Sequence, residues 1–282
     1  MRQAGAGDAP TPGGTGLSLR EPTTEEDPEV AVRTRKTRRT IVLAVAAVAV
    51  LVACTTVIVV SQGHEKYPWH TDIVSTTFWV GEIHDPDAED GSQVYSTYDS
   101  RWMESYGGCD GIETADGCST EPRVAGNGYF PSSMTPLENP FYLDLPFDDL
   151  NNPEAFAQRG TVIPWAAEEA ADNPALLTSS RHSFMKNRWV KLRKGDAVCY
   201  GQIQDAGPAL YDDSAYVFGE DDRRPASTEY NGAGLDVSPA INGCLGYSNL
   251  DGQDDRVDWQ FVDAEDVPDG PWLRVITTSQ VQ

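Results

Sequence analysis

The alternation of hydrophobic and polar positions divides this chain of 282 residues into an apolar run and a later region of short segments. Residues 41–60 are twenty residues without a charge, long enough to cross a bilayer as one helix. Short aromatic and β-branched runs predict strands at Thr76–Val80, Pro140–Leu145, Val257–Val262 and Trp272–Thr277. The pattern therefore predicts a mainly β domain that follows one transmembrane helix.

The clearest local pattern predicts a β-hairpin. Trp189–Leu192 alternates apolar and polar residues, Lys194–Asp196 has turn chemistry, and Ala197–Ile203 is a second strand-like run. Asp205 follows where this second strand breaks, because Gly207-Pro208 cannot continue an ordinary ladder. We therefore expect the carboxylate of Asp205 at the end of the strand, near a rim.

A short helix is predicted just after a second carboxylate. Ser238 is a natural N-cap with Pro239 at the first helical position, and Gly246 is a natural stop. Pro239–Leu245 should therefore be helical, and Asp236 should lie on the incoming strand. Two more short helices are predicted in the connections, at Asn152–Gln158 and Trp165–Ala171.

The region before the domain predicts how the protein is anchored. Residues 1–40 are rich in Gly, Pro, Thr and charge, which is typical of a disordered tail. Basic residues between Arg33 and Arg39 place that tail on the cytoplasmic side, so residues 61–75 form a linker and residues 76–282 an extracytoplasmic domain. Leu51–Cys54 also matches a lipobox, so lipidation at Cys54 is the alternative to a retained transmembrane helix in the cell membrane.

Charge and cysteine content narrow the function classes. Residues 61–282 hold 14 Lys and Arg against 38 Asp and Glu, a formal charge of −24, which excludes nucleic acid as a partner. Apart from Cys54 there are four cysteines, an even number that suits disulfides in an exported protein. Three pairings are possible; we favour Cys109 with Cys118 and Cys199 with Cys244.

The segment from Phe184 to Gly246 resembles the double-psi β-barrel domain of rare-lipoprotein-A-like proteins. There, a strand ends in an Asn-Asp-Arg-Gly-Pro-type turn and a later strand runs into an Asp-Leu-Ser-x-Ala helix start. The corresponding words here are Gln-Asp205-Ala-Gly-Pro and Leu-Asp236-Val-Ser-Pro-Ala. Thr77–Val80 and Tyr106–Cys109 are similar, more loosely, to expansin-like barrels. The resemblance implies a six-stranded double-psi-like barrel with insertions and short helices.

The resemblance also implies an activity on cell-wall polysaccharide. In lytic cleavage of peptidoglycan, one carboxyl group protonates the glycosidic oxygen and then assists closure of an anhydro ring. Asp236 would be that acid and base, with Asp205 as the second catalytic carboxylate, so the protein would be a lytic transglycosylase or a glycoside hydrolase. Tyr200, Asp99 and Trp102 are predicted to bind substrate. Ala206 departs from the family, which usually has arginine at that position.

Several alternatives remain open. An Asp just before a helix start is often only an acceptor for backbone donors. A non-catalytic glycan-binding module, or a module for interactions at the cell surface, is therefore the competing function. The acidic run Asp85–Gly91 has the oxygen-rich spacing of a calcium loop but lacks the bidentate Glu, so neither a metal nor another cofactor is predicted. Ser238 has no histidine partner for nucleophilic catalysis.

Overall fold

Six strands close into one barrel in the computed structural model, which describes residues 66–85, 87, 91–115 and 117–282. Around the barrel the strand order is β1-β7-β4-β6-β5-β8. The strands are β1 (His70–Thr77), β4 (Tyr142–Leu145), β5 (Trp189–Lys194), β6 (Ala197–Ala206), β7 (Leu235–Val237) and β8 (Asp255–Val262). The pairs β1–β7 and β4–β6 are parallel and the other four are antiparallel. This mixed barrel confirms the mainly β prediction and is compatible with a double-psi barrel.

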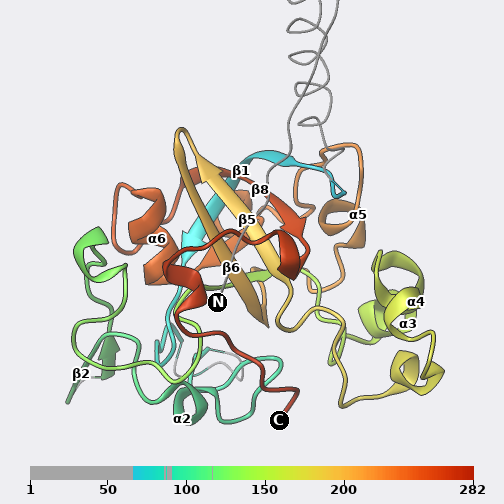
Figure 1. Cartoon of the computed structure of the whole chain (residues 1–282), viewed down its shortest axis with the longest axis horizontal. Helices are drawn as coiled ribbons and strands as arrows, with labels where there is room; N and C mark the ends of the chain where they lie inside the picture. The colour runs from blue at the N-terminus through green and yellow to red at the C-terminus, as the bar shows by residue number, and fades with distance from the viewer. Residues whose placement is uncertain (1–65, 86, 88–90, 116) are drawn as a thin grey trace, which may run out of the picture. The chain divides into compact units, whose positions relative to one another are not determined.

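The other elements lie in the connections between barrel strands or after the last of them, β8 (Figure 1). A separate two-stranded sheet is formed by β2 (Ile112–Thr114) and β3 (Gly117–Ser119). The α-helices are α2 (Trp102–Tyr106), α3 (Pro153–Val162), α4 (Ala166–Glu169), α5 (Ser214–Val217) and α6 (Pro239–Leu245). The 3-10 turns are η1 (Ala125–Asn127), η2 (Pro174–Thr178), η3 (Tyr230–Gly232), η4 (Ala264–Asp266) and η5 (Pro271–Leu273).

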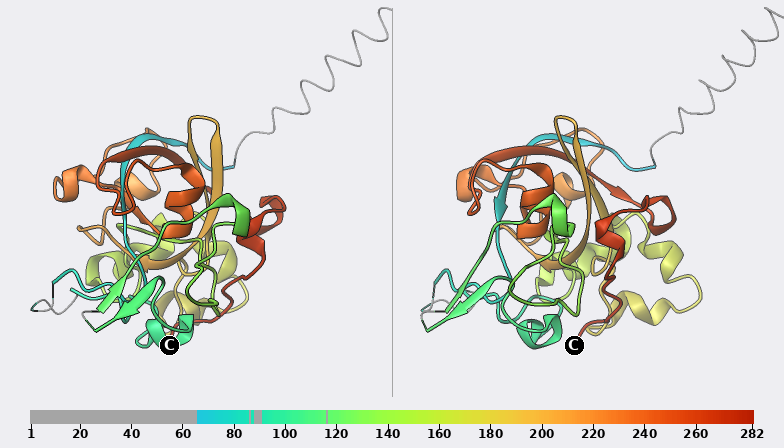
Figure 2. Two further views of the ribbon diagram at one scale, coloured as in Figure 1. Left: turned by 90° about the vertical axis from the view of Figure 1, so that its left-hand side faces the viewer. Right: turned by 60° about the vertical axis from the view of Figure 1, so that its left-hand side comes forward.

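Two local predictions are confirmed closely. The β5–β6 hairpin pairs from Trp189↔Gln202 to Lys194↔Ala197, and its tip projects beyond the barrel (Figure 2). Helix α6 has the predicted bounds, with the Ser238 side chain accepting a hydrogen bond from the amide of Ile241. Both elements rely on caps and turns that act within a few residues, so sequence alone defines them.

The predicted strand Trp272–Thr277 is wrong. Residues 271–273 form the 3-10 turn η5 instead, started by a proline at its first position, and no described strand follows it. The tail after this turn is held by a side chain rather than by a ladder. The amide of Gln202 accepts from the backbone N–H of Thr277 at 2.9 Å and donates to its carbonyl at 3.1 Å. A single side-chain amide thus replaces a neighbouring strand, which an alternation pattern does not detect.

The predicted tail 1–40, the predicted transmembrane span 41–60 and Cys54 lie outside the described residues. Among the helices in the described part, none is long and apolar enough to cross a membrane. Strand β1 begins at His70, inside the predicted linker 61–75, and residues 65–282 cluster as one compact unit.

Buried charge fixes two of the insertions. The guanidinium of Arg159, on α3, is fully buried and donates to five backbone carbonyls between residues 149 and 182. A second buried group is the carboxylate of Asp110, which accepts from the hydroxyls of Tyr106 and Tyr142 and from the guanidinium of Arg123. Because unpaired buried charges are costly, these partners hold the loops around α3 and α2 in place.

Candidate functional site

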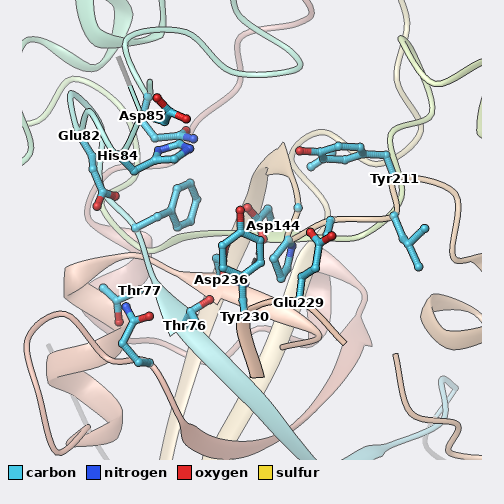
Figure 3. A pocket seen from close by; sticks show the side chains of 18 residues that line it. Thr76, Thr77, Glu82, His84, Asp85, Asp144, Tyr211, Glu229, Tyr230 and Asp236 are labelled. Carbon is cyan, nitrogen blue, oxygen red and sulfur yellow. Dashed lines mark hydrogen bonds between the residues drawn. The ribbon is translucent and has the colours of Figure 1, made fainter. Parts of the chain in front are cut away.

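A cleft of about 490 Å³ opens at the end of the barrel where β6 leaves the sheet. It is lined by the end of β1 and the loop after it, by β4, by residues 206–211, by the turn before β7, and by β7. Figure 3 shows Asp236, Asp144, Glu229 and Tyr230 near its centre, with Glu82 to one side. Carboxyl groups therefore dominate its polar surface.

Three of the barrel's aspartates lie side by side on adjacent strands. Asp144 of β4 is the antiparallel register partner of Asp236 on β7 and the parallel partner of Asp205 on β6. The β4–β6 register shifts by one residue between Leu143 and Asp144, so that Asp205 rather than Gln204 lies opposite Asp144. Such irregularities commonly re-aim side chains next to functional sites.

Asp236, on β7, has an unpartnered carboxyl oxygen and a raised pKa. One of its carboxyl oxygens, Oδ1, is buried and has no hydrogen-bond partner within the described part of the protein. Burial, followed by the negative charges of Glu82 and Asp205, raises the pKa of Asp236 to about 8. A carboxyl group with this pKa is largely protonated at neutral pH, which is the state that a general acid requires.

Asp144 supports Asp236 from the neighbouring strand. Its side chain is 3% exposed, and Oδ1 accepts a 2.9 Å hydrogen bond from the backbone N–H of Asp236. Burial, and then the charges of Asp236 and Asp205, raise the pKa of Asp144 well above its ordinary value. Burial on adjacent strands thus makes both of these neighbouring carboxyl groups resist ionisation.

Asp205 lies on β6, on the side of Asp144 away from Asp236, and does not line the cleft. Its Oδ1 accepts from the backbone N–H groups of Thr97 at 2.7 Å and Ala206 at 2.8 Å. Burial nevertheless raises the pKa of Asp205 to about 6. Its carboxylate therefore holds the loop at Thr97 and contributes charge to the site, while two backbone donors occupy its Oδ1.

Glu82 adds a further carboxyl group on the wall formed by the loop after β1. It lines the cleft, and Oε2 accepts a hydrogen bond from the backbone N–H of Trp79 at 3.3 Å. Burial is the main cause that raises the pKa of Glu82 to about 7. Glu82 and Asp236 are thus two acids of the same cleft that change charge close to neutral pH.

The three predicted substrate-binding residues lie away from this cleft. Tyr200 is buried with its ring 5.0 Å from that of Trp272, and Trp102 is buried in a small core with Phe78 and Tyr142. Asp99 is 1% exposed, and its Oδ1 accepts from the amide of Arg101. Tyr200 and Trp102 therefore pack against other aromatic rings, and Asp99 accepts a backbone hydrogen bond at the start of α2.

Both favoured cysteine pairings are present as disulfides. Cys109–Cys118 joins residues nine apart, with a Cα–Cα distance of 5.6 Å, and adjoins the buried carboxylate of Asp110. Cys199–Cys244 ties β6 to α6, with a Cα–Cα distance of 6.3 Å. The second bridge therefore fixes the strand that carries Asp205 to the helix that follows Asp236.

Asp144 and Glu82 were missed by reasoning from the sequence. Asp144 carries a usable signal, because it is a lone acid inside the apolar run Phe-Tyr-Leu-Asp-Leu, and buried acids in strands are rare without a role. Glu82 sits in an acidic loop and has no comparable signal. Residues 86 and 88–90 of the considered calcium loop lie outside the described part, and the described residues contain no group of three potential metal ligands.

Comparisons with known proteins do not assign this site to a family. No protein-family model, no curated protein and no solved structure matches the chain.

Proposed function

We propose that the cleft binds and cleaves a cell-wall glycan lytically, with Asp236 as the acid and base. The observation that carries the proposal is that Asp236 lines the cleft and that its buried Oδ1 has no hydrogen-bond partner among the described residues. A polar atom in this position is satisfied when a ligand supplies the missing hydrogen bond. The glycosidic oxygen of a sugar polymer is such a ligand, since it accepts a proton from a neutral carboxyl group.

The proposed reaction uses one proton that returns to its origin. Protonated Asp236 donates its proton to the glycosidic oxygen while the bond from that oxygen to the anomeric carbon breaks. The resulting carboxylate then takes the proton of a hydroxyl on the same sugar, and that hydroxyl oxygen bonds to the anomeric carbon. An anhydro ring forms, no water is consumed, and Asp236 is protonated again.

Asp144 and Glu82 have supporting roles in this mechanism. The 2.9 Å bond from the Asp236 amide to Asp144 holds the strand that carries the acid. Glu82 contributes a negative charge that helps keep Asp236 protonated. Neither role requires a second nucleophile or a positioned water, which favours the lytic reaction over direct hydrolysis.

The cellular setting of the proposal rests on the sequence. The resemblance to rare-lipoprotein-A-like barrels supports a cell-wall substrate, and the span 41–60 after a basic segment supports a membrane anchor with the domain outside. Peptidoglycan next to the membrane would then be within reach of the cleft.

The test is product analysis with the compact unit, residues 65–282, and intact or peptide-stripped peptidoglycan. Mass spectrometry should detect anhydro-sugar fragments with the wild type and none with Asp236→Asn. Asp196→Asn is the matched control, because it makes the same change at the β5–β6 turn, about 30 Å along β6 from the cleft. Reducing-end products would replace the lytic mechanism by hydrolysis.

A non-catalytic glycan-binding module is the second candidate. The backbone hydrogen bonds that occupy Asp205 favour it, since they are what a structural carboxylate makes. Sedimentation of the protein with the polymer, without any released fragment, would select this function.

A further inference from the structure

Tyr230 is an exposed aromatic residue at the edge of the cleft. Of the Phe, Tyr and Trp side chains that the structure describes, it alone is more than a third exposed, at 57%. Within the same described part, its ring pairs with no other aromatic ring, although most neighbouring aromatics pack in the core. It lines the cleft together with Asp144 and Asp236, and Figure 3 labels all three. A tyrosine needed only for stability would bury its ring.

The backbone under Tyr230 is strained and firmly held. Tyr230 and Asn231 have φ angles of 48° and 61°, the left-handed region that favours glycine. Hydrogen bonds fix this turn, from Gly232 N to Glu229 O at 2.8 Å and from Asn231 Nδ2 to Gln253 O at 3.2 Å. Two adjacent non-glycine residues in this region cost folding free energy, and such strain concentrates where function requires a fixed side chain.

A second loop that lines the cleft also has a left-handed backbone and an exposed side chain. Ala209 and Leu210 have φ angles of 41° and 50°, and Leu210 is 46% exposed. Both loops line the cleft, so an exposed ring and an exposed aliphatic side chain border the row of carboxyl groups. An apolar edge beside hydrogen-bonding groups matches the two kinds of surface of a sugar ring, its C–H face and its hydroxyl rim.

The charge of the cleft limits which sugar it takes. Five of the described lining residues are Asp or Glu, and none of them is Lys or Arg. A glycan with a carboxylate or sulfate on every sugar would meet like charges along its whole length without a compensating cation. An N-acetylated hexosamine polymer is uncharged and meets no such barrier.

We propose that Tyr230 is the stacking platform for an uncharged N-acetylhexosamine ring, and that the acidic lining of the cleft disfavours glycans with a charge on every sugar. This inference rests on the proposed function for the site and names its substrate class. The platform contacts the ring before and during cleavage alike, so its loss should weaken binding without slowing the chemical step.

The test compares Tyr230→Leu with Tyr230→Phe in the full chain, purified in mild detergent. Both variants place a large apolar side chain on the same strained backbone, but only Phe keeps the aromatic ring. Calorimetry with chitohexaose, on an Asp236→Asn background that prevents turnover, should give a dissociation constant about tenfold higher for Leu than for Phe or Tyr. On active protein, KM should rise by a similar factor with kcat unchanged. A hexamer of galacturonate should bind far more weakly at low salt.

The outcomes separate the inference from the proposed function. Equal binding by Tyr230→Leu and the wild type, no binding of chitohexaose, or tight binding of galacturonate would each overturn the platform. Tyr230-dependent binding without any cleavage would retain the platform and reject the lytic activity. Cleavage that depends on Asp236 but not on Tyr230 would do the reverse.

Discussion

The backbone N–H of Asp236 donates a 2.9 Å hydrogen bond to Oδ1 of Asp144. This bond joins β7 to β4 by a side chain at the level where the two aspartates are register partners. It orients one buried acid by means of another, at a place where the charge of Asp236 disfavours ionisation of Asp144. The site is therefore sensitive to pH and unfavourable for stability, and both properties can be measured.

Asp144→Asn should stabilise the fold at alkaline pH. The folded pKa of Asp144 is raised above its unfolded value, so folding favours the protonated form, and stability falls as pH rises through that range. Asparagine keeps the oxygen that accepts from the Asp236 amide and cannot ionise. We expect the free energy of unfolding at pH 8 to rise by about 1–2 kcal/mol in urea titrations. Asp196→Asn should change it by less than about 0.5 kcal/mol, and a loss of stability in Asp144→Asn would contradict the assignment.

The pH profile of glycan cleavage should have an alkaline limb near pH 8, because Asp236 must be protonated to act as an acid. Glu82→Gln removes the charge that contributes most to the raised pKa of Asp236, so the limb should move to lower pH. Rates of fragment release between pH 5 and 10 measure it. An unmoved limb in Glu82→Gln would show that another group governs the profile.

His70 should make the fold sensitive to acid. Its ring is 1% exposed and stacks on Trp259 at 4.1 Å, and burial lowers the pKa of His70 to about 4. The unfolded chain binds this proton near pH 6.5, so stability is lost as pH falls from 6.5 to 4, by at most about 3 kcal/mol. His70→Phe retains a stacked ring and should reduce that loss. Urea unfolding of both proteins at pH 7 and pH 4.5 provides the comparison, and identical pH dependence would exclude His70 as the cause.

The two disulfides should contribute unequally to stability. Their sequence separations are 45 residues for Cys199–Cys244 and nine for Cys109–Cys118. Loop-closure entropy predicts losses of about 4 and about 2.5 kcal/mol when the respective pairs are replaced by alanine. Thermal and urea unfolding of the two double variants would test this order. A larger loss for the shorter loop would mean that local packing around Asp110 outweighs chain entropy.

Local signals account for the parts that the sequence predicts well. The β5–β6 hairpin and helix α6 follow from Lys194–Asp196, Ser238 and Pro239, each of which acts within one turn. Asp205 and Asp236 are correctly expected near strand ends for the same reason. The closed barrel itself depends on parallel pairs between distant strands, and only the resemblance to a known barrel suggested it.

The row of aspartates depends on relationships that no local pattern encodes. Asp205 lies opposite Asp144 because the β4–β6 register shifts by one residue. Asp236 lies opposite Asp144 because β7 pairs with β4, although the two residues are more than 90 positions apart in the sequence. The sequence likewise predicts that the ring of Trp102 can bind substrate, yet the ring is buried against Tyr142 on β4. Spacing along a chain does not show which side chains a crossover brings together.

The bridge between Cys199 and Cys244 closes a covalent ring that contains much of the cleft. Residues 206–211, Glu229, Tyr230 and Asp236 all lie between its two ends, and the long connection through residues 219–226 is largely exposed. A protease that cuts this connection would leave both fragments joined through the sulfur atoms. The nicked protein should then keep its acid, its aromatic platform and their relative positions, and only reduction would release the second fragment. In the extracytoplasmic setting proposed above, where proteases are present, such a ring would keep the cleft assembled after its backbone has been cut.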